Sequence, residues 1–343
     1  MKNQNNISVV ITSINKPNKI IKKIFSECKK KKIKMIIIGD KKTPKYENKY
    51  EMVDIKKQNN LNFKLSKILP LNSYSRKNIG YLISMSRGSE IIIETDDDNY
   101  PKKNFFNDLE KFKKIKLLKG NEWINIFKFF SKDKNKLIWP RGFPLDEIKK
   151  NPKIKYKIKN VFSPVQQRLC DGNPDVDAIF RLTRNFKSIV FQKNIKVALD
   201  KNSLCPFNSQ NTVWHKESFP LLYLPSHCTM RATDIWRSFV TLRVMKCFNW
   251  RLTFLPSTVV QKRNFHNLLD DFNLEFPVYK NSKIFNEVLK SLNLSNDKLR
   301  ILENIFKCYE ALIKYRILDK KELDLIYKWL LDIQKIYPNL RKI

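Results

Sequence analysis

The sequence lacks several features that define common protein classes. Only 6 of its 343 residues are glycine, and the motifs G-x-G-x-x-G, G-x-x-x-x-G-K-[ST] and G-x-S-x-G do not occur. Nicotinamide-dependent, P-loop kinase and nucleophile-elbow hydrolase functions therefore have no support. The 6 cysteines show no C-x-x-C spacing. We expect free thiols in a reducing compartment, with neither a structural zinc nor a disulfide framework.

Long apolar runs are also missing. The first apolar segment, ISVVITSI at residues 7–14, is short and follows a polar start. No segment approaches the ~18 apolar residues that a membrane-spanning helix requires. We therefore expect no signal peptide and no transmembrane segment, and a soluble, cytoplasmic protein.

Acidic residues are scarce compared with basic ones. The chain has 33 Asp and Glu against 68 Lys and Arg, of which 14 are Arg, and a net charge of +35. One explanation is a lysine-rich composition spread over a solvated surface. The other is attraction to phosphates of a nucleotide, a nucleic acid or an anionic membrane. No zinc-finger or RNP-type motif is present, so we expect no specific nucleic-acid partner, and peripheral membrane contact through the lysines stays open.

Apolar, β-branched runs alternate with helical patterns over the first hundred residues. This alternation predicts an α/β fold with a mostly parallel sheet flanked by helices. Helices are expected at 15–33 and at 75–88, the second ending at Gly88. Strands are expected at 7–14, 34–40, 50–55 and 89–98.

The rest of the chain divides into three parts. Phe105, Leu109, Phe112 and Ile115 have helical spacing and predict a helix after Pro101. Residues 120–270 are irregular and rich in Pro, aromatics and Arg, and residues from about 280 onward read as helices. We expect one domain over residues 1–278 and a helical C-terminal extension over residues 279–343.

The segment EIIIETDDDNYP, residues 90–101, places three aspartates directly after a buried strand. Residues two apart on an extended chain point to the same side, so Asp96 and Asp98 can converge while Asp97 points away. Two convergent carboxylates suit Mg²⁺ or Mn²⁺, which prefer oxygen ligands. The alternative is a solvated acidic turn.

A family resemblance rests on a series of motifs. The stretch SRKNIGYLISMSRGSEIIIETDDDNYP resembles the core of GT-A glycosyltransferases. A closer resemblance, to the STELLO glycosyltransferase-like family, is carried in order by VVITSINKP, IIGDKKTP, LPLNSYSRKNIGYL, ETDDDNYP, IWPRGFPL, DGNPDVDAIFRLTR, PFNSQNTVWH, DIWRSF and QKRNFHNLLDDF. It implies a GT-A, Rossmann-like fold, a nucleoside-diphosphate sugar of UDP or GDP type, a glycan acceptor and bound Mn²⁺ or Mg²⁺.

The resemblance also implies roles for residues on the donor side. Thr12 and Asp40 would hold the nucleobase and ribose, and Arg76, Lys77 and Asn78 begin a helix whose N-terminus favours phosphate or nucleotide oxygens. Arg263 would bind the diphosphate. The implied donor site is Thr12, Asp40, Arg76, Asn78, Asp96, Asp97 and Arg263. A turn aspartate at Asp40 and a solvated basic first turn at Arg76 are the alternatives.

Asp234 is the catalytic candidate, because inverting enzymes of the GT-A type often place their catalytic acid at a helix start, as in RATDIWRSF. Its alternative is a plain helix N-cap. His266 would complete the metal ligands Asp96 and Asp98, although a single His is more often a surface or core residue.

Six further residues could contact the sugar or the acceptor: Trp139, Arg141, Asp175, Asp177, Asn208 and Gln210. Asp175 and Asp177 could instead pair with Arg181 and Arg184, and the Trp139 segment could be a rigid proline loop. The leading hypothesis is a metal-dependent glycosyltransferase. The others are a non-catalytic GT-A-fold partner of a polysaccharide-synthesising complex and a basic protein that binds nucleic acid or membranes.

Overall fold

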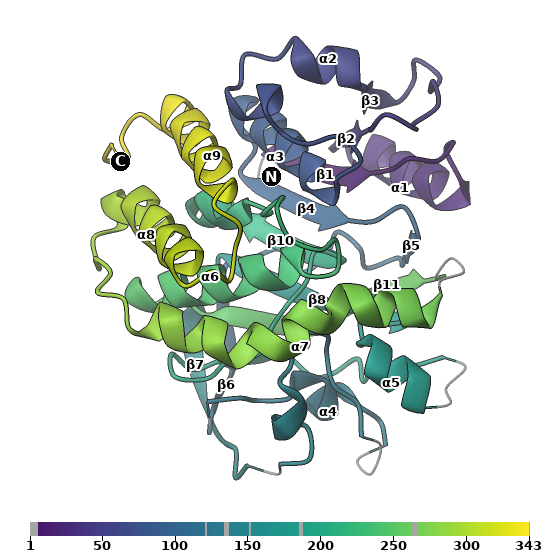
Figure 1. Ribbon diagram of the computed structural model, residues 1–343. Coiled ribbons are helices and arrows are strands. Elements are labelled where there is room, and N and C mark those ends of the chain that lie inside the picture. Colours follow the sequence, from purple (N-terminus) through teal and green to yellow (C-terminus); the bar gives the residue numbers. More distant parts are fainter. Residues whose placement is uncertain are drawn as a thin grey trace.

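A computed structural model describes residues 6–120, 122–133, 137–150, 152–184, 188–262 and 267–342. The described strands form one 11-stranded sheet in the order β3-β2-β1-β4-β10-β8-β11-β9-β6-β7, with β5 paired to β11 (Figure 1). The strands are β1 (Ile7–Thr12), β2 (Lys34–Ile38), β3 (Glu51–Val53), β4 (Ile91–Thr95), β5 (Asn99–Pro101), β6 (Phe112–Lys119), β7 (Lys155–Phe162), β8 (Val165–Gly172), β9 (Val197–Leu199), β10 (Asn211–His215) and β11 (Leu252–Gln261).

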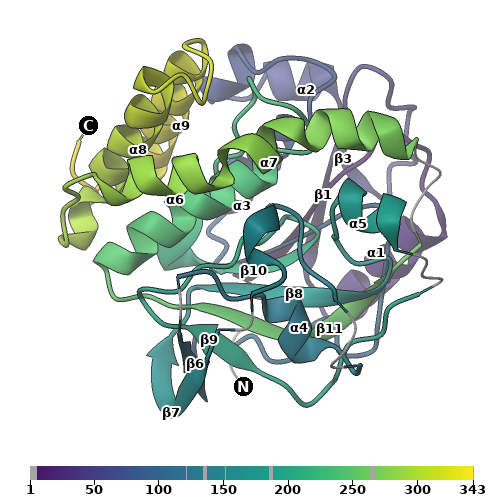
Figure 2. The same ribbon diagram turned by 60° about the horizontal axis from the view of Figure 1, so that its bottom comes forward.

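The described helices pack on both faces of this sheet (Figure 2). They are α1 (Lys19–Lys30), α2 (Ile55–Asn59), α3 (Lys77–Ser86), α4 (Ile126–Phe130), α5 (Ala178–Thr183), α6 (Thr233–Cys247), α7 (Leu268–Lys290), α8 (Ile301–Lys314) and α9 (Glu322–Ile336), with short 3-10 turns at Leu65–Lys67, Tyr74–Arg76, Leu145–Glu147, Lys216–Leu222 and Lys298–Arg300.

The N-terminal part of the sheet has the predicted parallel α/β arrangement. β1 pairs in parallel with β2 and β4, and β2 with β3. Alternate side chains pack into two hydrophobic cores, one on each face of the sheet. Val9 and Ile11 pack on the side of α1, whereas Val10 and Ile36 pack on the side of α3. Both faces are therefore covered, which explains why these strands read as continuous apolar runs.

Beyond β4 the sheet becomes mixed. β10 runs antiparallel to both neighbours, β4 and β8, whereas β8 and β11 are parallel. The α/β class is confirmed, with antiparallel pairs added to the parallel set in the second half of the sheet. Among the described residues no helix combines the length and the apolar character needed to cross a bilayer. All six cysteines are free.

The predicted helix through Phe105, Leu109, Phe112 and Ile115 is wrong. Residues from Phe112 onward form β6, in which exposed and buried side chains alternate from Phe112 to Lys116. Asp108, with φ of 59°, redirects the chain before this strand. Pairing of β6 with β7 and β9 prevailed over the helical spacing of the four apolar residues.

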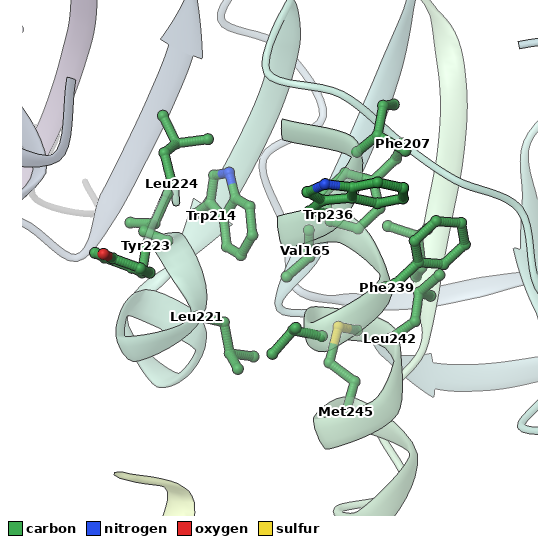
Figure 3. Packing of buried hydrophobic residues seen from close by; sticks show 14 of the residues in the cluster. Val165, Phe207, Trp214, Leu221, Tyr223, Leu224, Trp236, Phe239, Leu242 and Met245 are labelled. Atoms are coloured by element: carbon green, nitrogen blue, oxygen red, sulfur yellow. The ribbon is translucent and has the colours of Figure 1, made fainter. Parts of the chain in front are cut away.

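Helix α6 begins at Thr233, as expected from the sequence, and packs along the sheet. Figure 3 shows Trp236, Phe239 and Met245 of α6 beside Val165 and Trp214 of β8 and β10, all of them buried. Trp236 also stacks on Phe285 of α7, with ring centroids 4.7 Å apart. This packing fixes the position of the first turn of α6, where Asp234 lies.

The C-terminal helices share the core of the rest of the chain. α7 crosses the expected boundary at residues 278 and 279, and Phe285 and Trp329 belong to the same buried cluster as Val10. Asp332 on α9 accepts hydrogen bonds from the backbone N–H groups of Lys64 and Leu65 at 2.8 and 2.9 Å. The helical extension is therefore packed against the N-terminal half of the sheet.

Candidate functional site

A cavity of about 450 Å³ opens at the carboxyl ends of β1, β2 and β4. In open α/β sheets ligands bind at this edge. Among the described residues its lining contains six Asp and five Lys or Arg, so these residues bring no excess of positive charge to the cavity. The charged lining residues are Asp40, Asp96, Asp97, Asp98, Asp175, Asp234, Lys42, Arg76, Arg141, Arg181 and Arg231.

Asp96 is paired with a buried lysine. Its Oδ1 accepts hydrogen bonds from Lys77 Nζ at 2.9 Å and from the Tyr74 hydroxyl at 2.8 Å. Lys77 has no exposed surface and also donates to the Thr95 carbonyl oxygen at 2.9 Å. Burial raises the pKa of Asp96, and the charge of Lys77 offsets part of that increase.

Asp97 points toward the loop after β1. Its Oδ2 accepts hydrogen bonds from Ser13 Oγ at 2.6 Å and Asn15 Nδ2 at 3.3 Å, and its carbonyl oxygen accepts one from Asn18 Nδ2 at 2.7 Å. The side chain of Asn18 also caps α1. The divergence of Asp97 from its neighbours thus ties the acidic turn to the first helix.

Asp98 has an unsatisfied oxygen. Gln261 Nε2 donates to Oδ2 at 2.7 Å, but the buried Oδ1 has no hydrogen-bond partner among the described residues. Burial, with the nearby charge of Asp96, raises the pKa of Asp98 to about 7. A buried carboxylate oxygen without a partner is costly in the absence of a cation or donor.

This arrangement fits a hard divalent cation. No cluster of three or more His, Cys, Asp or Glu able to hold a metal occurs within the described part of the chain. Mg²⁺ commonly takes only one or two protein carboxylates and obtains its other ligands from water and substrate phosphates. Asp96 and Asp98 can supply those two carboxylates, with Oδ1 of Asp98 as the open position. Arg263 and His266, two further predicted site residues, lie outside the described residues.

Arg141 lies between two carboxylates on the opposite wall. It donates to both oxygens of Asp175 at 2.8 Å and to both oxygens of Asp234 at 3.0 and 2.9 Å. Burial opposes ionisation of Asp234, but the attraction of Arg141 outweighs it and lowers the pKa of Asp234 to about 2. Asp234 is therefore the ionised partner of Arg141 near neutral pH.

Hydrogen bonds connect the two walls. Ser209 Oγ lies 3.2 Å from Asp234 Oδ2 and 2.6 Å from the Tyr74 hydroxyl, which also donates to Asp96. The acidic turn after β4 and the start of α6 consequently belong to one hydrogen-bond network across the cavity.

The end of β2 forms another part of the lining. Both oxygens of Asp40 accept backbone N–H groups, those of Asn72 and Ser73, at 3.0 Å. Arg76 is buried and donates from Nε to Gln58 at 2.8 Å, while its Nη2 has no partner among the described residues. Burial lowers the pKa of Arg76. Thr12 also lines the cavity, so three residues expected on the donor side meet there.

Four predicted site residues do not line the cavity. Asn78 is buried and forms a pair of hydrogen bonds with the backbone of Leu224, joining α3 to that segment. Trp139 donates from Nε1 to Asp177 Oδ2 at 2.6 Å, and Asp177 caps α5. Asn208 accepts the N–H of Gln210 at 3.1 Å, and Gln210 itself does reach the cavity.

Three residues that shape the cavity were not predicted as site residues from the sequence. Tyr74 holds Asp96, Ser13 holds Asp97, and Gln261 holds Asp98. No local pattern points to them, because their aspartate partners lie 22, 84 and 163 positions away. The sequence places Lys77 in a helix start that favours phosphate or nucleotide oxygens, whereas in the structure Lys77 is buried and pairs with Asp96.

A second buried ion pair lies next to the site, between β4 and α6. Glu94, next to the acidic turn on β4, accepts hydrogen bonds from Arg237 at 2.7 and 2.9 Å and from Trp214 Nε1 at 2.8 Å. The guanidinium of Arg237 also lies over the Trp214 ring, 4.9 Å from its centroid. This pair joins β4 to α6 one turn after Asp234.

The chain is similar in sequence to known glycosyltransferases. The family model described as STELLO glycosyltransferases matches residues 231–343. The probable glycosyltransferase STELLO2 of Arabidopsis thaliana is 28% identical over 248 residues, which are 66% of this chain and 32% of the relative. STELLO1 of the same plant is 27% identical over 234 residues, which are 62% of this chain and 30% of that relative.

These matches confirm the resemblance to the STELLO family inferred from the sequence motifs. The chain spans about a third of the length of these curated relatives.

Proposed function

We propose that this protein is a glycosyltransferase that moves a sugar from a nucleoside-diphosphate sugar, of UDP or GDP type, to a glycan acceptor. The similarity to STELLO glycosyltransferases supports the reaction class. The observation that carries the proposal is Oδ1 of Asp98, which has no hydrogen-bond partner among the described residues and lies beside Asp96 in a cavity at the carboxyl end of β4. A cation shared with a diphosphate gives that oxygen a partner.

Mn²⁺ or Mg²⁺ is the cofactor that we propose, held by Asp96 and Asp98. When bound, it would neutralise negative charge that grows on the leaving diphosphate. The residues of this chain prepare its position. Lys77 and Tyr74 fix Oδ1 of Asp96, and Gln261 fixes Oδ2 of Asp98, so both carboxylates are oriented before a donor binds.

Different parts of the cavity lining suit the nucleoside and the sugar of the donor. We assign the nucleoside to the wall of Thr12, Asp40 and Arg76, where Arg76 Nη2, which has no partner among the described residues, can donate to a nucleobase or phosphate oxygen. Ser209 and Gln210, also in the lining, offer hydrogen-bonding groups of the kind that sugar hydroxyls require.

Asp234 is better suited to positioning than to proton transfer. A general base works best when its pKa lies near the working pH, and the pKa of Asp234 is about 2. We propose that Asp234 holds Arg141 and Ser209 in place, and that the network reaches the acidic turn through Tyr74.

The same ion pair favours a second candidate, a non-catalytic protein that binds a nucleotide sugar within a larger complex. The carboxylate of Asp234 is paired with Arg141. If no other group accepts the proton of the acceptor hydroxyl, the nucleotide sugar would bind but its sugar would not be transferred. Turnover therefore separates the two candidates, whereas nucleotide binding supports both.

The decisive experiment measures thermal unfolding of the purified chain with UDP or GDP, each with and without Mn²⁺. We expect the melting temperature to rise only when nucleotide and cation are both present, and the rise to disappear in Asp98→Asn. The matched control is Asp324→Asn, which changes an exposed aspartate on α9 with 63% of its side chain exposed. Stabilisation that persists in Asp98→Asn would overturn the metal site.

Incubation with a range of UDP- and GDP-sugars and glycan acceptors then tests the reaction. Sugar release or transfer that requires the cation supports the transferase. Cation-dependent binding without turnover on any acceptor supports the non-catalytic candidate. A chain that binds no nucleotide in either condition contradicts both.

A further inference from the structure

The strands β6 and β7 form an antiparallel pair at one edge of the sheet, a wide hairpin whose two strands are connected by residues 120–154. β7 is the last strand in the sheet order, and Figure 2 shows it at the lower margin of the molecule, outside β6 and β9. Its first six residues, 155–160, are all exposed. An exposed edge strand of this length requires an explanation, because it offers unpaired backbone groups to other molecules.

One face of this pair carries large apolar side chains next to lysines. The register aligns Phe112 with Phe162, Lys116 with Ile158, and Leu118 with Tyr156, so these residues share a face. Phe112 is 68% exposed, Ile158 60% and Tyr156 54%. We call Phe112, Lys114, Lys116, Tyr156 and Ile158 the hairpin face.

The charge of the two strands is entirely positive. β6 and β7 contain seven lysines and no Asp or Glu. Lys113 pairs with Asp108, whereas the other six have no carboxylate within ion-pair distance in the described part of the chain. Lys116 Nζ lies 4.7 Å from the centre of the Tyr156 ring. Charge and apolar surface are thus interleaved on the same exposed patch.

We propose that the hairpin face binds the surface of an anionic lipid bilayer. Phe112, Tyr156 and Ile158 would enter the interfacial region, and the lysines around them would contact lipid phosphate and carboxylate groups. The long lysine side chains can extend toward the headgroups while the apolar residues go deeper. This site is separate from the proposed nucleotide cavity, whose lining contains no residue of β6 or β7.

Two other occupants fit less well. A second copy pairing along β7 would bring Lys155, Lys157 and Lys159 close to the same lysines of its neighbour, and like charges across a strand pair repel. A nucleic acid would use the charge, but it would leave Ile158 without a favourable contact. Arginine, which binds phosphate through two hydrogen bonds, is absent from both strands.

The test is flotation of the full chain with vesicles of phosphatidylcholine alone or mixed with phosphatidylserine, at several salt concentrations. A chain of net charge +35 can bind anionic vesicles non-specifically, so the informative variants keep the charge. We expect Phe112→Ser combined with Ile158→Asn to weaken binding to the mixed vesicles about tenfold. Ile284→Asn is the matched control on α7, where Ile284 is 50% exposed.

A second pair of variants tests the charge. Lys114→Gln with Lys116→Gln should weaken vesicle binding and reduce its salt dependence, whereas Lys320→Gln with Lys321→Gln, in the turn between α8 and α9, should change both much less. Hydrogen exchange should show protection of residues 155–162 when mixed vesicles are added. Melting temperatures should stay unchanged in all variants, because each altered side chain is exposed.

Three results would overturn the proposal. One is equal loss of vesicle binding in the hairpin variants and their controls, which would indicate diffuse charge. Another is protection of residues 155–162 by an oligonucleotide but not by vesicles. The third is a concentration-dependent dimer that Ile158→Asn abolishes. Cation-dependent nucleotide binding should be intact in every hairpin variant, so failure here leaves the transferase proposal unaffected.

Discussion

Three adjacent aspartates receive three different environments. Lys77 neutralises Asp96, the hydroxyl of Ser13 and the amide of Asn15 hold Asp97, and one oxygen of Asp98 has no partner among the described residues. The repulsion expected from their proximity is thus relieved at the first two positions. It remains at Asp98, which is why that position has the properties of a ligand site.

The role of Lys77 can be tested through stability. Removing one member of a buried ion pair leaves the other without compensation. We expect Lys77→Met to lower the free energy of unfolding by roughly 2–4 kcal/mol, since the side chain of Asp96 is 27% exposed and partly solvated. Urea unfolding measures this change.

Lys22→Met, on the exposed side of α1, is the control and should change stability little. The double variant Lys77→Met/Asp96→Asn should lose less stability than the sum of the two single variants. Strict additivity of the two changes would show that the pair is not coupled.

At the scale of individual elements, helix α3 packs closely against strands β1 and β2. A Cβ atom at Gly80 would lie 2.5 Å from Val10 Cγ1 and 3.0 Å from Ile38 Cγ1. Glycine is therefore needed at this position for α3 to approach β1 and β2. The close approach carries Lys77, one turn earlier, to the end of β4.

Gly80→Ala tests this contact. Helix propensity alone predicts that alanine stabilises a helix by about 1 kcal/mol relative to glycine. Overpacking against Val10 acts in the opposite direction and typically costs about 1–3 kcal/mol. We expect a net loss of stability in chemical denaturation, and a weaker cation-dependent response to nucleotide. Ser86→Ala on the same helix is the control. A gain in stability in Gly80→Ala would mean that the helix can move away from the sheet.

At the scale of the whole molecule, buried polar groups make stability depend on pH. His215 on β10 is 4% exposed and lies 3.2 Å from Gln166 Nε2. Burial lowers the pKa of His215 to about 4, and the charge of Glu217 offsets this only in part. Because the unfolded chain binds a proton near pH 6.5 and the folded chain does not, this contribution is fully present above pH 6.5.

Acidification should therefore weaken the fold. As the pH falls from about 6.5 to about 4, protonation of His215 in the unfolded state should remove about 3 kcal/mol of stability. Urea unfolding across this range should show a smaller decrease in His215→Gln, which cannot titrate. Equal decreases in the two proteins would show that His215 is protonated within the fold.

The sequence alone determined the elements whose signals are local. Continuous β-branched runs predicted the parallel strands, Gly88 marked the end of α3 with φ of 76°, and the apolar residues after Thr233 predicted α6. The position of the three aspartates after β4 followed from the same patterns. The predicted helix over Phe105–Ile115 failed because strand pairing is a contact with distant residues.

Only the tertiary structure decided which partner each charged group obtained. Arg141 meets Asp234 across 93 positions of sequence, and Lys77 meets Asp96 across 19. Local periodicity cannot specify such pairs, because they depend on where the sheet order brings separate segments together. The sequence alone gives the positions of the aspartates and of Arg141 along the chain. Burial and long-range pairing lower the pKa of Asp234 and leave one oxygen of Asp98 without a partner among the described residues.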